Sequence, residues 1–324
     1  MRALVLGGNR YIGMQLLYEL ADQGHEVTVM NSHLADMPEG TRRLHGDRRV
    51  PGVLEEVLGP HRDEFDVVYD NTSYVVADVE PLVALFQGRV SHYVFTSSAA
   101  VYRRSFVQPV TESSRTHDPG DDDPRKAYGV GKVRCERYLF GLQASDGFPA
   151  TSLRVTHTIG PRSPLASREP SFFARLEQGR PILIPGDGFP FVHLVDVADV
   201  ARCMVAVASS EAAAGNAYNV AGPEITSVAG CMHLMGRAAG ASPRIVNVPM
   251  AVARRTNPPL VHWGEAIMGG TILSIDRAAT DLGWRPQIGL EAAYRRSYDW
   301  WATAGRDRYE YDFARDDALL AELG

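Results

Sequence analysis

Residues 2–13 read RALVLGGNRYIG, and this stretch decides which fold the rest of the chain is expected to form. Its first part, Arg2–Leu6, is a short apolar run typical of a buried strand. Glycines follow at once, and apolar residues at helical spacing then continue to Gly24, a residue type that often ends helices. A second apolar run, Glu26–Met30, predicts another strand. A strand, a glycine turn, a helix and a strand in this order predict a βαβ unit.

The same alternation of short apolar runs and helical patterns continues through the first half of the chain. It predicts a Rossmann-type, doubly wound α/β fold, in which helices cover both faces of a parallel sheet. The further strands are expected at Arg43–His45, Asp66–Tyr69, Val90–Thr96 and Thr151–Val155, and the helices at Val53–Leu58, Val79–Phe86 and Ala127–Ala144.

The character of the sequence changes after Gly160-Pro161, where glycine and proline become frequent. We therefore expect a dinucleotide-binding domain over residues 1–160 and a smaller, mainly substrate-binding portion over residues 161–324. Three pieces near residues 191–222 still read as strand or helix and are expected to return to the first domain: Phe191–Val195, Asp196–Ala208 and Ala217–Val220.

Composition limits the classes of protein to which this chain can belong. It has 324 residues, of which 45% are hydrophobic, as in a globular protein with a substantial core. Its net charge of −6 gives no general attraction for nucleic acid or anionic membranes, so neither is expected as a partner. No apolar run reaches about 18 residues and the apolar start ends in two glycines, so neither a transmembrane helix nor a signal peptide is expected. Three cysteines without metal-ligand spacing predict reduced thiols, a cytoplasmic location and no metal site.

The spacing Gly7, Arg10, Gly13 matches a dinucleotide-binding turn at its first and last positions but not at its middle one. Glycine in such a turn allows a tight bend and close packing of helix on strand. The phosphates would lie at the helix N-terminus, where free amides and the helix dipole favour anions. Arg10 can place a guanidinium near a phosphate. A plain strand-to-helix turn is the alternative, and the surrounding βαβ pattern favours cofactor binding.

The end of the second strand indicates which nicotinamide dinucleotide binds. An acidic residue there selects NAD, because it accepts hydrogen bonds from the adenosine ribose. This chain has Asn31-Ser32-His33 and no acid before Asp36, which favours NADP slightly over NAD. Neutral Asn31 could also serve NAD. Arginines at positions 10, 42 and 43 are available for a 2′-phosphate, and we interpret the arginines at 42, 43, 48 and 49 as a solvated face or cofactor rim.

Tyr128 and Lys132 lie four residues apart in the stretch AYGVGK, residues 127–132, and would share one face of a helix. A free tyrosine is a poor base near neutral pH, because its pKa is about 10. A neighbouring ammonium favours the phenolate and lowers that pKa. The pair therefore suits chemistry in which a phenol moves a proton, although the spacing alone also occurs by chance in helices.

Together these features resemble the extended short-chain dehydrogenase/reductases, a family that includes NAD-dependent sugar epimerases and dehydratases. The resemblance covers nearly the full length of the chain. Besides the glycine turn and the tyrosine–lysine spacing, it rests on SSAAVY at residues 97–102, Leu153-Arg154 with Gly160-Pro161, FVHLVDVA at residues 191–198 and LGWRP at residues 282–286. Arginine in the middle of the glycine turn makes the chain most similar to the branch that contains the chloroplast stem-loop-binding proteins.

The resemblance implies roles for individual residues. Ser98 would hydrogen-bond the reacting substrate oxygen and Tyr128 would be the general acid/base. Lys132 would hold the nicotinamide ribose hydroxyls and, with a positively charged nicotinamide, lower the pKa of Tyr128. Asp47 would contact the adenine amino group. The implied cofactor-binding residues are Gly7, Asn9, Arg10, Tyr11, Ile12, Gly13, Asn31, Ser32, Asp47, Arg48 and Asn71, with Tyr128 and Lys132. Relatives often dimerise through helices that include the tyrosine–lysine helix, so a homodimer is expected.

Two positions depart from the pattern of the sugar epimerases. The asparagine that touches the substrate diphosphate is replaced by His157, and an arginine that also contacts phosphate is replaced by Phe189. An apolar or aromatic substrate therefore becomes plausible in place of a nucleotide sugar, in a pocket that Tyr74, Phe106, Phe189, Phe191 and Trp263 could line. The predicted substrate-binding residues are Tyr74, Ser98, His157 and Phe189. A structural role for His157 is equally open, and His193 is expected to hold a strand and a loop together.

The resemblance implies an NAD(P)-dependent enzyme that moves hydride between the nicotinamide and a carbinol or ketone carbon of a small molecule. Epimerisation and net reduction or oxidation would use the same residues, and an NADPH-dependent ketoreductase acting on a non-sugar metabolite is the alternative. Two further hypotheses are an RNA-associated scaffold, which the negative charge disfavours, and a cofactor-sensing regulator without turnover.

Overall fold

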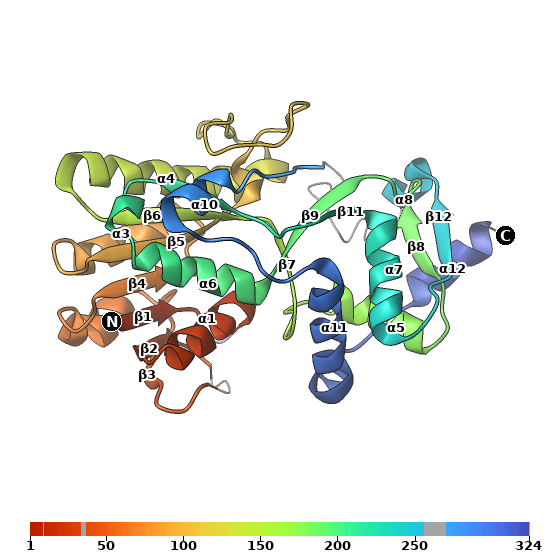
Figure 1. Ribbon diagram of the computed structural model, residues 1–324, viewed down its shortest axis with the longest axis horizontal. Coiled ribbons are helices and arrows are strands. Elements are labelled where there is room, and N and C mark those ends of the chain that lie inside the picture. Colours follow the sequence, from red (N-terminus) through yellow and green to blue (C-terminus); the bar gives the residue numbers. More distant parts are fainter. Residues whose placement is uncertain (9, 34–36, 256–269, 324) are drawn as a thin grey trace. The chain divides into compact units, whose positions relative to one another are not determined.

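The computed structural model describes residues 1–8, 10–33, 37–255 and 270–323, and the chain divides into two compact units (Figure 1). The first unit contains Met1–Thr156, Val197–Ala221 and Leu273–Pro286, and the second contains His157–Asp196, Gly222–Ile272 and Gln287–Gly324. The division differs from the expected one in three places, of which the first is that the N-terminal segment ends at Thr156 and not at residue 160. The strand at 191–196 belongs to the second unit, because its strand partners lie there, and the return of residues 273–286 to the first unit is not evident in the sequence.

The first unit is built on a seven-stranded sheet in which all neighbouring strands are parallel. The order across the sheet is β10-β6-β5-β4-β1-β2-β3. From β1 the chain moves outward to β3 and then returns to build the other half from β4, so the carboxyl ends of β1 and β4 flank the switch point at which such sheets bind ligands. The strands are β1 (Arg2–Leu6), β2 (Glu26–Asn31), β3 (Arg42–His45), β4 (Val67–Asp70), β5 (His92–Ser98), β6 (Ala150–Val155) and β10 (Ala217–Val220).

Helices cover both faces of this sheet. Helix α1 (Tyr11–Asp22) packs against α6 (Val197–Ala208), whereas α2 (Val53–Leu58), α3 (Val76–Phe86) and α4 (Ala127–Asp146) pack next to one another in chain order. Aliphatic and aromatic side chains from β1, β4 and β5 form a core with α2, α3 and α4. Helix α10 (Asp276–Leu282) lies in the returning segment and contacts β10. The predicted doubly wound fold is confirmed.

Helix α3 begins three residues earlier than the sequence pattern predicts. The carboxylate of Asp78 accepts hydrogen bonds from the backbone amides of Tyr74 (2.8 Å) and Val75 (3.1 Å). Such bonds satisfy amides at a helix N-terminus that have no partner within the helix. The cap also holds the loop of residues 71–75, which connects the carboxyl end of β4 to α3.

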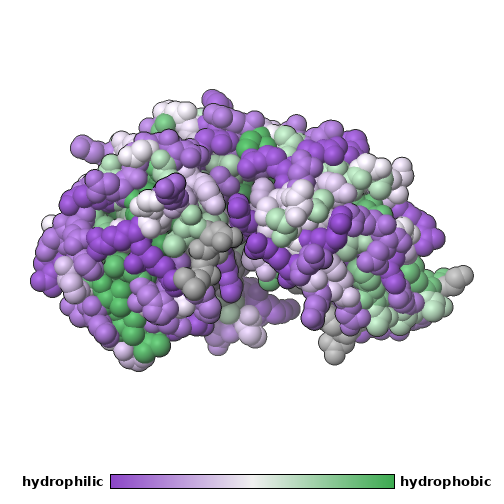
Figure 2. All heavy atoms as spheres, turned by 90° about the horizontal axis from the view of Figure 1, so that it is seen from below, coloured by the Kyte–Doolittle hydropathy of each residue, from purple (hydrophilic) through white to green (hydrophobic). Residues whose placement is uncertain are grey.

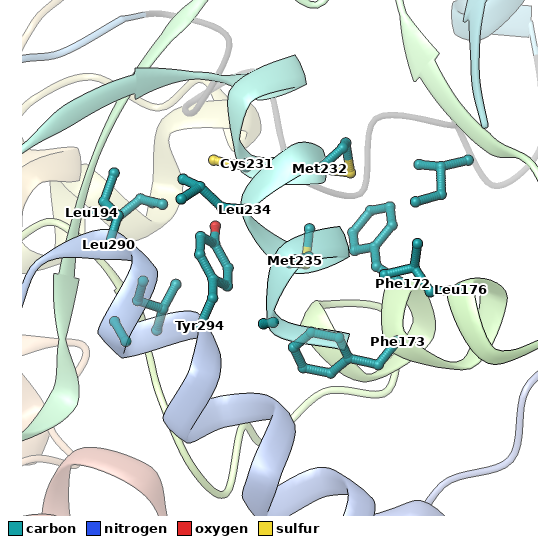
Figure 3. Close-up of a cluster of buried hydrophobic side chains, with 14 of the residues drawn as sticks. Phe172, Phe173, Leu176, Leu194, Cys231, Met232, Leu234, Met235, Leu290 and Tyr294 are labelled. Atoms are coloured by element: carbon teal, nitrogen blue, oxygen red, sulfur yellow. The ribbon is translucent and has the colours of Figure 1, made fainter. Parts of the chain in front are cut away.

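The described part of the second unit has two small sheets and its own core. One sheet consists of β7 (His157–Ile159), β9 (Phe191–Asp196) and β11 (Ile225–Ser227), and the other of β8 (Ile182–Pro185) and β12 (Ile245–Val248). The helices are α5 (Glu169–Glu177), α7 (Val228–Ala239), α8 (Met250–Arg255), α11 (Leu290–Trp300) and α12 (Ala314–Leu323). Figure 3 shows how side chains of α5, α7 and α11 meet in this core, with the Tyr294 hydroxyl directed towards α7. His193 of β9 hydrogen-bonds the carbonyl oxygen of Gly222 at 2.8 Å and so links the strand to a loop.

No helix of the described residues is both long and apolar enough to cross a membrane. The face of the molecule in Figure 2 is mainly hydrophilic, with smaller hydrophobic areas among the polar ones. Within the described ranges, no three histidine, cysteine, aspartate or glutamate side chains lie where they could hold a metal ion. The cysteines at 135, 203 and 231 are buried and unpaired, and burial raises the pKa of each thiol.

His92 of β5 is buried, and its Nε2 lies 2.8 Å from the Thr151 hydroxyl, which donates to the carbonyl oxygen of Ala213. Burial lowers the pKa of His92 from 6.5 to about 4. Below about pH 6.5 the unfolded chain therefore binds a proton that the folded chain excludes. This contribution to stability is present above about pH 6.5 and is lost as the pH falls towards 4.

We expect His92→Gln to weaken the acid sensitivity of folding. Between about pH 7.5 and about pH 5, the variant should lose about 2 kcal/mol less of its free energy of unfolding than the unmodified protein. Urea unfolding of both proteins at the two pH values measures the difference. Parallel losses in the two proteins would contradict a buried neutral histidine at this position.

Candidate active site

The glycine turn between β1 and α1 brings the helix N-terminus close to the end of β4. Gly7 has a φ of +83°, and a Cβ there would lie 2.3 Å from Cγ2 of Thr72. A Cβ on Gly13 would lie 2.2 Å from the carbonyl oxygen of Gly7, so the helix packs directly on the turn. The turn therefore has the close backbone packing that a dinucleotide-binding turn requires. Tyr11 and Ile12, whose amides were predicted to face the phosphates, form the first turn of α1, and Asn9 lies outside the described residues.

Two asparagines at the carboxyl ends of strands each leave one buried donor without a partner. Asn31 of β2 accepts a hydrogen bond from Nε of Arg43 (2.8 Å), and Asn71, after β4, accepts one from the Thr96 hydroxyl (2.6 Å). The Nδ2 atoms of both asparagines have no partner among the described residues. A buried donor without an acceptor costs about 1–3 kcal/mol, so a ligand is the expected partner. These residues therefore fit a dinucleotide lying across the ends of β2 and β4.

Asp47 and Arg48, both predicted to bind cofactor, are engaged within the protein. Arg49 donates to the carboxylate of Asp47 and lowers its pKa to about 2. Nη1 of Arg48 donates to the Thr72 hydroxyl (2.6 Å) and lies 3.3 Å from the buried carboxylate of Asp70. The Arg48 guanidinium thus holds the loop after β4. Ser32, in turn, lies with its hydroxyl 2.8 Å from Nδ1 of His33.

Ser98 and Tyr128, which the sequence predicts to be the proton-transfer pair, lie on segments of the first unit that contact each other. Ser98 ends β5, its hydroxyl accepts a hydrogen bond from the amide of Ala100 (3.2 Å), and its side chain acts on the Tyr128 phenol to lower the pKa. Tyr128 is half exposed, and its ring lies 6.1 Å from that of Tyr74. Burial of the hydroxyl raises the pKa of Tyr128, whereas the Ser98 side chain opposes this rise. The expected lowering by Lys132 is not among the causes of this shift in the protein without cofactor.

Lys132 is buried, with 3% of its surface exposed, and its ammonium is directed to backbone oxygens. Nζ donates to the carbonyls of Ser73 (2.6 Å) and Thr96 (2.7 Å). It also lies 4.8 Å and 4.7 Å from the ring centroids of Tyr74 and Phe95, where cations are attracted to the π face. Burial lowers the pKa of Lys132 to about 8. Lys132 therefore joins α4 to the loop after β4 and to β5.

Two glycines of α4, absent from the predicted site, let this helix approach both loops. A Cβ on Gly129 would lie 2.2 Å from the carbonyl oxygen of Ala100, and one on Gly131 would lie 2.5 Å from that of Tyr74. Glycine is unfavourable inside helices, so a glycine there usually has a packing reason. The two glycines beside Tyr128 could therefore have predicted close packing from the sequence alone. They place Tyr128 next to the turn that carries Ser98.

The predicted substrate-binding residues are distributed over both units. Tyr74 and Ser98 lie with Tyr128 in the first unit, whereas His157 and Phe189 belong to the second. His157 lies 4.0 Å from the fully buried carboxylate of Glu169, and burial together with Arg168 lowers its pKa well below the ordinary value. Phe189 is 73% exposed and Phe191 54%, so both rings present apolar surface. Phe106, also proposed to line the pocket, is exposed on the first unit, and Trp263 lies outside the described residues.

The fold and the arrangement of Ser98, Tyr128 and Lys132 are those of a dinucleotide-binding α/β enzyme. Residues 3–221 match the model of the NAD dependent epimerase/dehydratase family, and the chain belongs to that family. The resemblance to extended short-chain dehydrogenase/reductases is thereby confirmed. Its curated relatives include an epimerase and a reductase, and the chain is an enzyme of the epimerase/dehydratase type.

Three similar proteins illustrate the range of the family. The chain is 28% identical to the chloroplast stem-loop binding protein of 41 kDa b of Arabidopsis thaliana, over 99% of this chain and 84% of that protein. It is 28% identical to the 2-alkyl-3-oxoalkanoate reductase of Stenotrophomonas maltophilia, over 91% of this chain and 98% of that protein. The UDP-glucuronic acid 4-epimerase of Bacillus cereus, solved with NAD, has the same fold, with a TM-score of 0.74, 18% identity and coverage of 97% and 99%.

Alanine substitutions at Gly129 and Gly141 test the close packing of α4 on one helix. Gly129→Ala should cost about 1–3 kcal/mol of stability, because the added methyl meets the Ala100 carbonyl. Gly141→Ala should instead stabilise by about 0.5–1 kcal/mol, because nothing lies within 4 Å of its Cβ position. Denaturant unfolding of both variants measures these effects. Equal effects of the two substitutions would show that α4 does not touch the turn at residue 100.

Proposed function

We propose that this protein is an NAD(P)-dependent oxidoreductase or epimerase that moves hydride between a nicotinamide and a carbinol or ketone carbon of a small molecule. The observation that supports this most directly is the close contact of the helix that carries Tyr128 and buried Lys132 with the turn that Ser98 caps, next to the unpartnered donor of Asn71. These groups supply the proton transfer, the oxygen-binding contact and the cofactor contacts of one reaction.

In this proposal each side chain has a separate task. The Ser98 hydroxyl holds the substrate oxygen, and the Tyr128 phenol gives its proton to that oxygen during reduction or takes it during oxidation. A bound nicotinamide supplies or accepts the hydride. Lys132 uses two of its three N–H groups on the Ser73 and Thr96 carbonyls and has one left for a ribose hydroxyl. The raised pKa of Tyr128 in the protein alone keeps the phenol protonated, which is the form that reduction needs.

The alternative within this class is an NADPH-dependent ketoreductase that acts on an apolar or aromatic metabolite. His157 and Phe189 stand where sugar epimerases carry polar phosphate contacts. Burial keeps His157 neutral, because its pKa is well below the ordinary value, so it supplies no positive charge for a diphosphate. The exposed rings of Phe189 and Phe191 suit an apolar substrate group. Similarity to a 2-alkyl-3-oxoalkanoate reductase is in line with this alternative.

The name of the Arabidopsis relative suggests an RNA-binding role. The arginine cluster at residues 42, 43, 48 and 49 gives this role little support, because its side chains have partners within the protein. Arg42 pairs with Glu64 (2.6 Å), Arg48 with Asp70 (3.3 Å) and Arg49 with Asp47 (2.7 Å). Arg43 is hydrogen-bonded to Asn31. Arginines neutralised in this way contribute little to the phosphate contacts that dominate nucleic-acid affinity.

We further propose that NADP is preferred over NAD. Arg43 already donates to the carbonyl oxygen of Asn31, so the NH₂ group is the part of this side chain that has no hydrogen bond among the described residues. A donor suits a 2′-phosphate, whereas the ribose hydroxyls of NAD are held by a carboxylate acceptor. Arg10 is exposed at the N-terminus of α1, where its charge favours an additional phosphate.

Replacing Tyr128 with phenylalanine should abolish turnover while cofactor binding is retained, because only the proton-transferring hydroxyl is removed. Nucleotide released by denaturation and identified by mass, followed by titration with NADH and NADPH, establishes the cofactor. Turnover is then measured with that cofactor on a panel of apolar ketones and nucleotide sugars. Undiminished turnover in the variant would end the catalytic assignment, and undiminished cellular function without turnover would favour a cofactor-sensing regulator.

Asn31→Asp should shift cofactor preference towards NADH. The added carboxylate accepts hydrogen bonds from ribose hydroxyls and repels a 2′-phosphate, so the ratio of NADH to NADPH affinity should rise roughly tenfold or more, about 1.4 kcal/mol. Quenching of protein fluorescence by each cofactor measures both affinities. Tenfold preference for NADH in the unmodified protein would contradict the proposed NADP selectivity.

A further inference from the structure

A buried polar network lies next to the Ser98–Tyr128 pair, within the first unit. Its centre is Arg154 of β6, 6% exposed, whose Nη2 lies 2.8 Å from a carboxylate oxygen of Glu136. Nη1 of Arg154 donates to the Tyr102 hydroxyl (2.9 Å) and to the carbonyl oxygen of Glu112 (3.0 Å). We call the following five residues the Arg154 network: Tyr102, Glu112, Glu136, Arg154 and Asn219.

The members of the Arg154 network bond to one another or to neighbouring backbone. The Tyr102 hydroxyl donates to Oδ1 of Asn219 (2.7 Å), and Nδ2 of Asn219 donates to two backbone carbonyls, at residues 110 and 274. Ser152 donates to the second oxygen of Glu136 (2.8 Å). Replacing a buried ion pair with apolar side chains is often neutral for stability, so stability alone does not explain this pair. Its directional bonds specify where the attached segments lie.

The segments that the network joins are the two that carry the proton-transfer pair. Glu136 lies on α4 one turn after Lys132 and two turns after Tyr128, at the spacing that keeps these residues on one side of a helix. Tyr102 directly follows the single turn Ala99–Val101, whose N-terminus Ser98 caps. One guanidinium therefore links the helix of Tyr128 to the turn of Ser98.

The same two segments touch through their backbones, so small shifts between them matter. At Gly129 the helix has no room for a methyl group against the carbonyl of Ala100. Hydrogen bonds weaken steeply with misalignment, and a slide of α4 along this contact changes the geometry between Ser98 and Tyr128. A satisfied, directional network next to a close backbone contact is suited to hold that geometry.

We propose that Arg154, acting through Glu136 and Tyr102, is a positioning residue that aligns Tyr128 with Ser98. Each nitrogen of its guanidinium donates to an acceptor of the protein, and its effect on the reaction is indirect. The alignment itself does not depend on the proposed function. Its purpose does, because aligning Tyr128 with Ser98 serves proton transfer only if the protein catalyses the proposed reaction.

The test compares two neutral replacements of buried ion pairs in the full-length protein. Glu136→Leu/Arg154→Met removes the pair without changing net charge. Arg175→Met/Asp316→Leu is the matched control, because that pair is equally buried and lies in the second unit. Glu136→Gln is a milder second variant that keeps the size of the side chain. Each protein is labelled with 3-fluorotyrosine, and the fluorine signal of residue 128 is assigned by its loss in Tyr128→Phe and followed against pH.

The readout is the ionisation midpoint of residue 128, which alignment with the Ser98 side chain is expected to lower. Ser98→Ala should raise this midpoint in the unmodified background. Glu136→Leu/Arg154→Met should raise it in the same way, with no further rise when Ser98→Ala is added, and Glu136→Gln should shift it in the same direction. In the Arg175→Met/Asp316→Leu control the midpoint should stay unchanged, and Ser98→Ala should keep its full effect.

An unchanged ionisation midpoint in Glu136→Leu/Arg154→Met would overturn the positioning role, provided that this variant unfolds cooperatively. If it does not fold, an unchanged midpoint in Glu136→Gln would overturn the role instead. The readout needs no substrate, so this failure leaves the proposed hydride transfer standing. Conversely, turnover retained in Tyr128→Phe would overturn the proposed function while the alignment of residue 128 could still be measured.

Discussion

The burial of the Lys132 ammonium is the constraint on which the first unit depends. A charged group away from water is costly unless hydrogen bonds replace its hydration. The carbonyls of Ser73 and Thr96 provide those bonds, and they belong to the loop after β4 and to β5. The hydrogen bonds that the Lys132 ammonium needs therefore bring α4, the loop after β4 and the end of β5 together at the carboxyl edge of the sheet. Gly131 allows the helix to come that close, since a side chain there would meet the backbone of Tyr74.

Polar groups around this edge are of two kinds: those that have hydrogen-bond partners within the protein and those that have none in the described chain. The first kind holds the fold together, and the second kind is available to a ligand. Asp70 accepts bonds from Ser73, Tyr93 and Arg48; burial opposes its ionisation, but the charge of Arg48 and these bonds lower its pKa. The Arg154–Glu136 pair is likewise satisfied by protein partners. The Nδ2 atoms of Asn31 and Asn71 are buried without a partner in the described chain. Satisfied groups hold the loops, and open donors mark the surface that a dinucleotide would occupy.

The second unit differs in the chemistry that it exposes. Its core is apolar, and its ionisable groups near His157 are buried, with Glu169 fully enclosed and hydrogen-bonded by Ser163 (2.9 Å). A neutral histidine and exposed phenylalanines offer shape and apolar surface rather than charge. Such a surface is better suited to selecting a substrate than to transferring protons. In the proposed reaction the proton chemistry belongs to the first unit, where the helix of Tyr128 packs on the turn of Ser98.

The sequence by itself determined the alternating strands and helices, the glycine turn and the spacing of Tyr128 and Lys132. These features depend on neighbours within a few residues, so periodicity and glycine placement suffice to predict them. Only the tertiary structure decided that Arg48 pairs with Asp70, that residues 273–286 return to the first unit, and that the NH₂ group of Asn31 is left without a partner in the described chain. It also decided that Arg154 links α4 to the Ser98 turn. Each of these outcomes depends on partners that are far apart in the chain. Local sequence does not identify such partners, because only the folded sheet brings them together.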